Sequence, residues 1–225
     1  MFCYQCEQTD RTPQPDRPNL LSFGCAATKG NCGKDATTAA LQDVLVEVNL
    51  GIGQYAQKLR ELGSPDPRFA AHASFDLFTT LTNVNFNATR FMSLIAEAVG
   101  VRDEAKSASG AAARAAGVEP ETLTGAAQFS PATKISEVVA QAATVGVDVG
   151  LDVIGADIVG LRNLNLYGLK GVCAYAHHAH ALGYRTDDTD AGIENGLAFL
   201  GAGPTEADAL LGEALELGNV NFTVM

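Results

Sequence analysis

The chain has 225 residues, of which 47% are hydrophobic, so it is long enough to bury a full core without disulfide bonds. Its formal net charge of −11 argues against nucleic acids and anionic membrane surfaces as partners. Because no run of about eighteen apolar residues and no secretory signal is present, we expect a cytoplasmic protein with reduced thiols and no membrane contact.

Residues 1–35 are the first predicted segment, and they hold four of the five cysteines, Cys3, Cys6, Cys25 and Cys32. The segment contains several prolines and glycines and has neither a helical nor a strand period, which predicts an irregular loop. A loop of this length in a compact protein is expected to be held by a group that it binds. In a reducing compartment, clustered cysteines bind metal more often than they form disulfides.

A first helical bundle is predicted over residues 36–100. Asp35 is placed to cap a helix from about residue 36 to residue 62, in which apolar side chains recur every three or four positions. A second helix follows after a proline-rich turn, and Asn87 is predicted to cap a third helix.

A linker with a short exposed helix is predicted over residues 101–132, which are rich in alanine, glycine and charge, and a second helical bundle over residues 133–225. In this bundle Asp188 or Asp190 is expected to cap a helix, and the last helix is expected to end near Gly218. The predicted fold class is therefore all-α, with two tandem bundles of about three helices each behind an irregular N-terminal cysteine loop.

An internal duplication is predicted to relate the two bundles. A shift of 120 positions aligns six residues with identical ones, namely Leu41, Gly51, Tyr55, Ala56, Leu62 and Gly63 with Leu161, Gly171, Tyr175, Ala176, Leu182 and Gly183. The tetrapeptide at residues 83–86 also recurs at residues 219–222. Six identities at one offset, together with a repeated tetrapeptide, indicate a repeated structural unit.

The cysteine spacing Cys-x2-Cys-x18-Cys-x6-Cys favours an iron–sulfur cluster. Four thiolates complete either a tetrahedral zinc site or such a cluster, but zinc would usually be bound by a second close pair. Here the second pair is wider and is flanked by Gly30 and Gly33, which let backbone N–H groups approach sulfide. The helix that starts at Asp35 adds a positive dipole. A zinc site and unligated thiols are the alternatives.

The opening residues 2–9, FCYQCEQT, resemble the start of the hybrid cluster (prismane) proteins, which act as hydroxylamine reductases. Further matching motifs lie at residues 24–25, 30–35, 40–43, 82–86, 167–171, 174–176 and 218–225. The resemblance implies that Cys3, Cys6, Cys25 and Cys32 hold an iron–sulfur cluster, with 4Fe-4S favoured over 2Fe-2S. In that family this cluster passes electrons to a second, hybrid iron–sulfur–oxygen cluster.

Two departures from the family limit what the resemblance implies. Eighteen residues separate Cys6 from Cys25, more than is usual in the family, so the cluster type is left open. The ligands of the hybrid cluster lie in domains that follow the Val224-Met225 motif, where this sequence stops. We therefore expect the helical N-terminal domain alone, transferring electrons while a redox partner protein supplies any catalysis.

A second candidate site consists of Cys173, His177 and His180, which share one face of a predicted helix, with His178 beside them. Three of the four histidines of the chain fall in this short stretch. Thiolate and imidazole are both good ligands for transition metals. The pattern predicts a second metal or redox site, which would support a small reductase of hydroxylamine, nitric oxide or oxygen species.

An exposed histidine patch is the alternative interpretation of this face. The duplication pairs it with Gly53, Gln57 and Arg60, a polar stripe that we expect to be solvated. A metal site would need a further ligand such as His72 or Glu47. A third hypothesis for the function is a redox-sensing interaction module, and an apolar seam near the last helices predicts a homodimer.

Two glycine pairs, Gly51-x-Gly53 and Gly168-x2-Gly171, lie inside predicted helices rather than after strands. They are therefore not dinucleotide-binding fingerprints. Close packing of helices explains both pairs.

Overall fold

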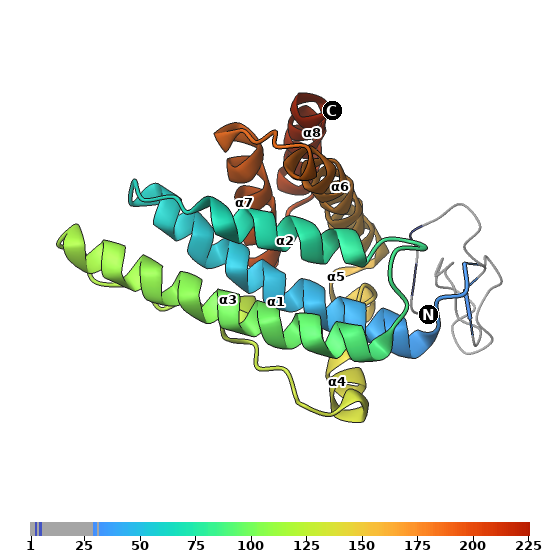
Figure 1. Ribbon diagram of the computed structural model, residues 1–225. Helices are drawn as coiled ribbons and strands as arrows, with labels where there is room; N and C mark the ends of the chain where they lie inside the picture. The colour runs from blue at the N-terminus through green and yellow to red at the C-terminus, as the bar shows by residue number, and fades with distance from the viewer. Residues whose placement is uncertain (1–2, 4, 6–28, 31) are drawn as a thin grey trace.

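The computed structural model describes Cys3, Gln5 and residues 29–30 and 32–225, and this part of the chain is all-α without strands, which confirms the predicted fold class (Figure 1). The helices are α1 (Ala36–Glu61), α2 (Pro67–Thr79), α3 (Ala88–Ala115), the 3-10 turn η1 (Gly125–Gln128), α4 (Ile135–Ala142), α5 (Leu151–Ile154), α6 (Ala156–Ala181), α7 (Asp187–Gly201) and α8 (Ala207–Val224). None of these helices is both long and apolar enough to span a membrane.

Helix α1 is the central element of the fold, and its bounds confirm the prediction. The Asp35 carboxylate caps its first turn by accepting a hydrogen bond from the Thr38 N–H at 2.7 Å. One face carries Leu41, Leu45 and Ile52, none of which is exposed to solvent. Because α1 packs against α2, α3, α4 and α7, it fixes where both halves of the chain lie.

Two helices are longer than predicted. Helix α3 continues to Ala115, so the first half of the predicted linker is helical. Alanine is the best helix former, and Ala105 and Ala113 are buried there. Helix α8 runs past Gly218 to Val224 because Val220 and Val224 pack onto the core beneath it.

The structure contains the predicted repeat of helices. Helix α6 begins and ends 120 residues after α1, and α7 begins 120 residues after α2. Gly63 and Gly183, which end the long helices, both have positive φ angles, of 72° and 84°. The repeated tetrapeptide is not part of this equivalence, because one copy lies in the turn between α2 and α3 and the other lies inside α8.

In each half of the chain, the long helix packs on a shorter helix of the other half. Helix α1 packs on α7 of the second half, and α6 packs in the same way on α2 of the first half (Figure 1). Helix α2 contributes to both cores, with Phe69 in one, formed with α1, α3 and α4, and Leu77 in the other, formed with α6, α7 and α8. The two halves therefore stabilise each other through reciprocal contacts.

The N-cap of α7 is Thr186, and the prediction of Asp188 or Asp190 was wrong. The Thr186 hydroxyl accepts a hydrogen bond from the Thr189 N–H, whereas Asp190 is buried and paired with Arg185. We expect Thr186→Ala to lower the free energy of unfolding by about 1 kcal/mol, since it removes the cap. Asp188→Ala, which removes an exposed carboxylate, should have a smaller effect in chemical denaturation, and a larger effect at Asp188 would contradict this assignment.

Candidate functional site

The cysteine loop is attached to the end of α2 through one carbonyl oxygen. The Gln5 side-chain amide donates a hydrogen bond to the Thr80 carbonyl at 3.0 Å, and the Lys34 ammonium donates to the same oxygen at 3.2 Å. The Thr82 hydroxyl in turn donates to the Gln5 side-chain oxygen at 3.3 Å. Gln5 and Lys34 are therefore both held at the turn between α2 and α3.

A tight turn presents Cys32 next to this anchor. The Gly30 N–H donates to the Lys34 carbonyl at 2.7 Å, and the Gly33 N–H donates to the Gly30 carbonyl at 2.9 Å. Gly33 has a φ of 94°, a conformation that residues with side chains rarely adopt. The nearest atom to a β-carbon placed on Gly33 would belong to the Phe86 ring, so the turn sits on the segment between α2 and α3.

Two buried lysines lie beside the cysteine loop. Lys34 and Lys170 are only 1% and 2% exposed. Burial lowers the pKa of Lys170 to about 8, against the opposing effects of Asp43 and of the nearby Cys3 and Cys173. The Lys34 ammonium group lies 6.0 Å from the ring centre of Phe86, and the Lys170 ammonium group lies 5.6 Å from that of Tyr167. Buried positive charge of this kind stabilises anionic groups, which here include thiolates.

Of the four predicted ligands, Cys3 and Cys32 are described by the structure, and both are half-buried. Cys6 and Cys25 lie outside the described residues. The two described residues are soft thiol donors. Cys3 is close enough to act electrostatically on Lys170, and Cys32 lies two residues before Lys34 and four before α1, a helix of 26 residues. An iron–sulfur cluster bound by four thiolates is negatively charged overall, so this environment fits it.

Motifs that are far apart in the sequence meet at this site. Gln42 on α1 donates a hydrogen bond to the Asn85 carbonyl at 3.4 Å, in the same turn that holds Gln5 and Lys34. Asp43 lies next to Lys34 and Lys170, which belong to two further motifs. Sequence reasoning missed these charged residues. A lysine inside an otherwise apolar helix segment, as at Lys170, was the available signal.

The second predicted site is not assembled as a ligand set. Cys173 is fully buried beside Ser74, and burial raises the pKa of its thiol to about 12. His177 stacks on Phe78 with ring centres 4.9 Å apart. Within the described residues, no three histidine, cysteine or carboxylate side chains are grouped so that they could hold a metal ion.

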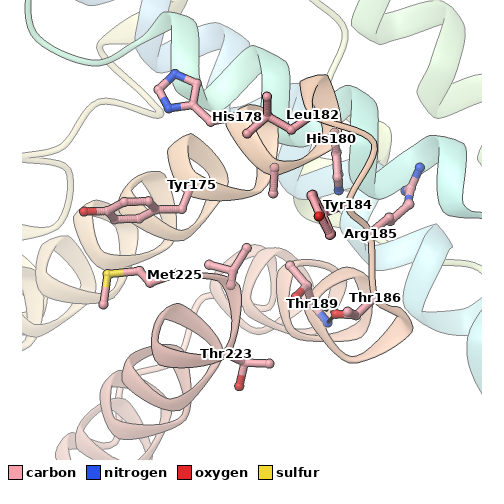
Figure 2. A pocket seen from close by; sticks show the side chains of 12 residues that line it. Tyr175, His178, His180, Leu182, Tyr184, Arg185, Thr186, Thr189, Thr223 and Met225 are labelled. Atoms are coloured by element: carbon pink, nitrogen blue, oxygen red, sulfur yellow. Dashed lines mark hydrogen bonds between the residues drawn. The ribbon is translucent and has the colours of Figure 1, made fainter.

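The other two histidines of this stretch face a different feature. His178 and His180 border a cavity of about 410 Å³, which lies between the last turns of α6 and the end of α8 (Figure 2). His180 is 4.0 Å from the buried carboxylate of Asp190, which is also paired with Arg185. Burial lowers the pKa values of His177 and His180. The histidines therefore divide between a packing contact and a surface cavity.

Gly53, Gln57 and Arg60 are the residues of the first half that correspond to Cys173, His177 and His180. Their contacts show why polar side chains occur on this face of the helix. Gln57 donates a hydrogen bond to Asn195, and Arg60 pairs with the buried Glu194 at 2.7 Å, both across the contact between α1 and α7. His177 occupies the equivalent position in the contact between α6 and α2. The expectation of a solvated stripe was therefore wrong, because Gln57 and Arg60 contact α7 of the other half. On α6, Cys173 and His177 likewise contact α2, whereas His180 borders the cavity.

His72, considered above as a further ligand, pairs instead with the buried Asp76 at 3.1 Å. Burial alone would lower the pKa of His72, but Asp76, Glu97 and Glu104 together raise it above the ordinary 6.5. The stability from this pair is therefore complete below pH 6.5 and is lost as the pH rises through the raised value.

We accordingly expect His72→Gln to destabilise the protein more at about pH 6 than at about pH 8. The control is His178→Gln, which removes an exposed histidine that has no ion pair within the described residues. Chemical denaturation at both values measures the effect, and an equal loss for His72→Gln at both would contradict the assignment of the pair.

The chain is similar over its whole length to known proteins. The model of the Prismane/CO dehydrogenase family matches residues 1–225. The chain is 56%, 46% and 40% identical to proteins named hydroxylamine reductase from Burkholderia ambifaria, Acidithiobacillus ferrooxidans and Rhodospirillum rubrum. Each match covers 100% of this chain and 39% of the relative, so the chain spans about two fifths of the length of these relatives.

Proposed function

This chain belongs to the Prismane/CO dehydrogenase family, and we propose that Cys3, Cys6, Cys25 and Cys32 bind one iron–sulfur cluster that accepts and donates single electrons. The observation that carries the proposal is the pair of buried lysines, Lys34 and Lys170, beside the cysteine loop. Two ammonium groups kept out of water at this point favour a negatively charged group among the cysteines.

The residues around the loop would each have a defined part in holding such a cluster. The four thiolates supply soft, charged ligands. Gln5 and Lys34 fix the ends of the loop at the Thr80 carbonyl, so the positions of the ligands do not depend on the loop alone. Lys170 supplies a positive charge from α6, so a residue of the second half of the chain also attracts the thiolates of the loop. A bound cluster supplies one-electron redox chemistry.

The names of the relatives support a wider reaction as the purpose of this electron transfer. Reduction of hydroxylamine to ammonia consumes two electrons, and an iron–sulfur cluster delivers them one at a time. We propose that residues 1–225 serve as the electron relay for such a reduction, with the chemistry at a site outside these residues and with electrons supplied by a redox partner protein. Among cluster types, 4Fe-4S is the first candidate and 2Fe-2S the second.

Anaerobic purification tests the proposal most directly. Protein loaded with iron and sulfide should show broad visible charge-transfer absorption that bleaches on reduction. Iron and sulfide analysis then distinguishes about four from about two atoms of each per chain. Stoichiometric zinc binding without such absorption would overturn the proposal.

The other functions considered above have less support. No described contact favours a reductase site at Cys173, His177 and His180. Self-association stays a prediction, and the exposed residues Leu215 and Phe222 on α8, which are 73% and 81% exposed, are a surface that a second copy could cover. Light scattering across micromolar concentrations measures this, and a strictly monomeric protein would contradict it.

A further inference from the structure

A second cavity lies close to the buried lysines on the side of α1 that faces α6. It has a volume of about 250 Å³ and is bordered by α1, α6 and residues 144–149. Asp43 and Glu47, one turn apart on α1, both line it. A space of this size is large enough to hold water molecules, and water next to a carboxylate can pass protons to it.

Asp43 connects this cavity with the charges beside the cysteine loop. On the cavity side its carboxylate accepts a hydrogen bond from the Val147 N–H and lies near Asp148. A β-carbon placed on Gly146 would be 3.2 Å from an Asp43 carboxylate oxygen and 3.5 Å from one of Asp148. Lys34 and Lys170, which do not line the cavity, also act on Asp43 electrostatically.

Two further charged groups, Arg162 and Glu47, border the cavity. Arg162 of α6 donates hydrogen bonds to the carbonyls of Gly203 and Pro204, both at 2.6 Å. Burial raises the pKa of Glu47, and no charged partner among the described residues offsets that burial. Glu47 is therefore placed where a carboxyl group can exchange protons with solvent in the cavity.

We propose that Asp43 takes up one proton through this cavity, by way of Glu47, when the cluster at the cysteine loop gains one electron. This inference rests on the proposed function, since it requires the cluster. One electron passes from an external one-electron donor to the cluster, and one proton passes from bulk water to a carboxylate oxygen of Asp43. Reoxidation returns both, so no other bond is made or broken.

Electrostatics gives the reason for the coupling. Burial raises the pKa of Asp43 to about 7, against the opposing effects of Lys170 and Lys34, while Asp148 adds to the rise. A further negative charge at the cluster raises that pKa again, because like charges disfavour ionisation. Between the two pKa values the reduced protein holds one proton more than the oxidised protein. The midpoint potential must then fall as the pH rises.

Potentiometric titration of the cluster-loaded chain at several pH values tests this. Above about pH 7 the equilibrium constant for reduction should fall by up to tenfold per pH unit, which corresponds to about 59 mV for one electron. Asp43→Asn should remove this dependence, and Glu47→Gln should keep the equilibrium dependence while slowing the proton-coupled phase of reduction. Glu61→Gln, an exposed carboxylate at the far end of α1, is the matched control and should behave as wild type.

A measurement on the unmodified chain covers the case in which Asp43→Asn does not assemble a cluster. The infrared difference spectrum between reduced and oxidised protein should then show the C=O band of a newly protonated carboxyl group, shifted in D2O. A pH-independent potential with the cluster intact, or a full pH dependence in Asp43→Asn, would overturn the inference and leave the proposed function standing. Absence of a cluster would instead overturn the proposed function.

Discussion

Replacing Cys3 or Cys32 with serine is expected to reduce the iron bound per chain by about tenfold or more and to remove the visible absorption. Serine is a hard ligand whose hydroxyl does not ionise near neutral pH, so it replaces a thiolate poorly. Both residues are half-buried next to the buried lysines, where loss of a negative ligand also leaves positive charge less well balanced. Iron analysis and absorption spectra of the anaerobically purified variants measure the loss.

Cys173→Ala is the matched control for these variants. Cys173 is fully buried, but it packs in the core with Ala73, Leu77 and other residues and is not one of the clustered cysteines. The variant should lose about 1 kcal/mol of stability and keep its iron. If Cys3→Ser and Cys32→Ser both kept full iron, these residues would not be the ligands. If Cys173→Ala alone lost iron, the cluster would lie elsewhere.

Gly53→Ala is expected to destabilise the protein by about 1–3 kcal/mol or more. A β-carbon at position 53 would stand 2.2 Å from the β-carbon of Leu197 on α7, so the two helices would have to move apart. The contact between α1 and α7 joins the two halves of the chain, which is why the loss should appear in the global unfolding transition. Chemical denaturation measures it.

Gly168→Ala gives the matched comparison, because it makes the same change in a helix. Among the residues that the structure describes, no atom beyond the adjoining helix backbone lies within 4 Å of the β-carbon it would add. Removing a helical glycine there should raise stability by roughly 0.5–1 kcal/mol. The two variants should thus change stability in opposite directions, and a loss for Gly168→Ala as large as that for Gly53→Ala would contradict this assignment.

These glycines also show what the sequence could establish about packing. Close helix contact was predicted for both pairs, and it is confirmed for Gly51 and Gly53, where an added β-carbon would meet the η1 backbone or Leu197. It is wrong for Gly168 and Gly171, which have open space around them. Periodicity places a residue on a helix, but the partner that approaches it is set by tertiary packing.

The helices could be predicted where local signals were strong. The apolar period and the Asp35 cap defined α1, and the offset of 120 residues predicted α6 from it. The length of α3 could not be predicted, since glycine and charge in residues 101–115 weaken the local helix signal, while the burial of Ala105 and Ala113 is set by packing. For the candidate site, the cysteines were visible in the sequence, whereas Lys34, Asp43 and Lys170 approach one another only through the fold.

The shared Thr80 carbonyl has a consequence for how this loop can vary in length. Gln5 and Lys34 meet at that oxygen, so these two residues are held at one point. The entropy lost on joining two points of a chain grows only with the logarithm of their separation in sequence, by roughly 0.6 kcal/mol for each doubling. The spacing of eighteen residues between Cys6 and Cys25 therefore adds little to the free energy of closure. Insertions and deletions between these two cysteines can accumulate while the anchor keeps its geometry.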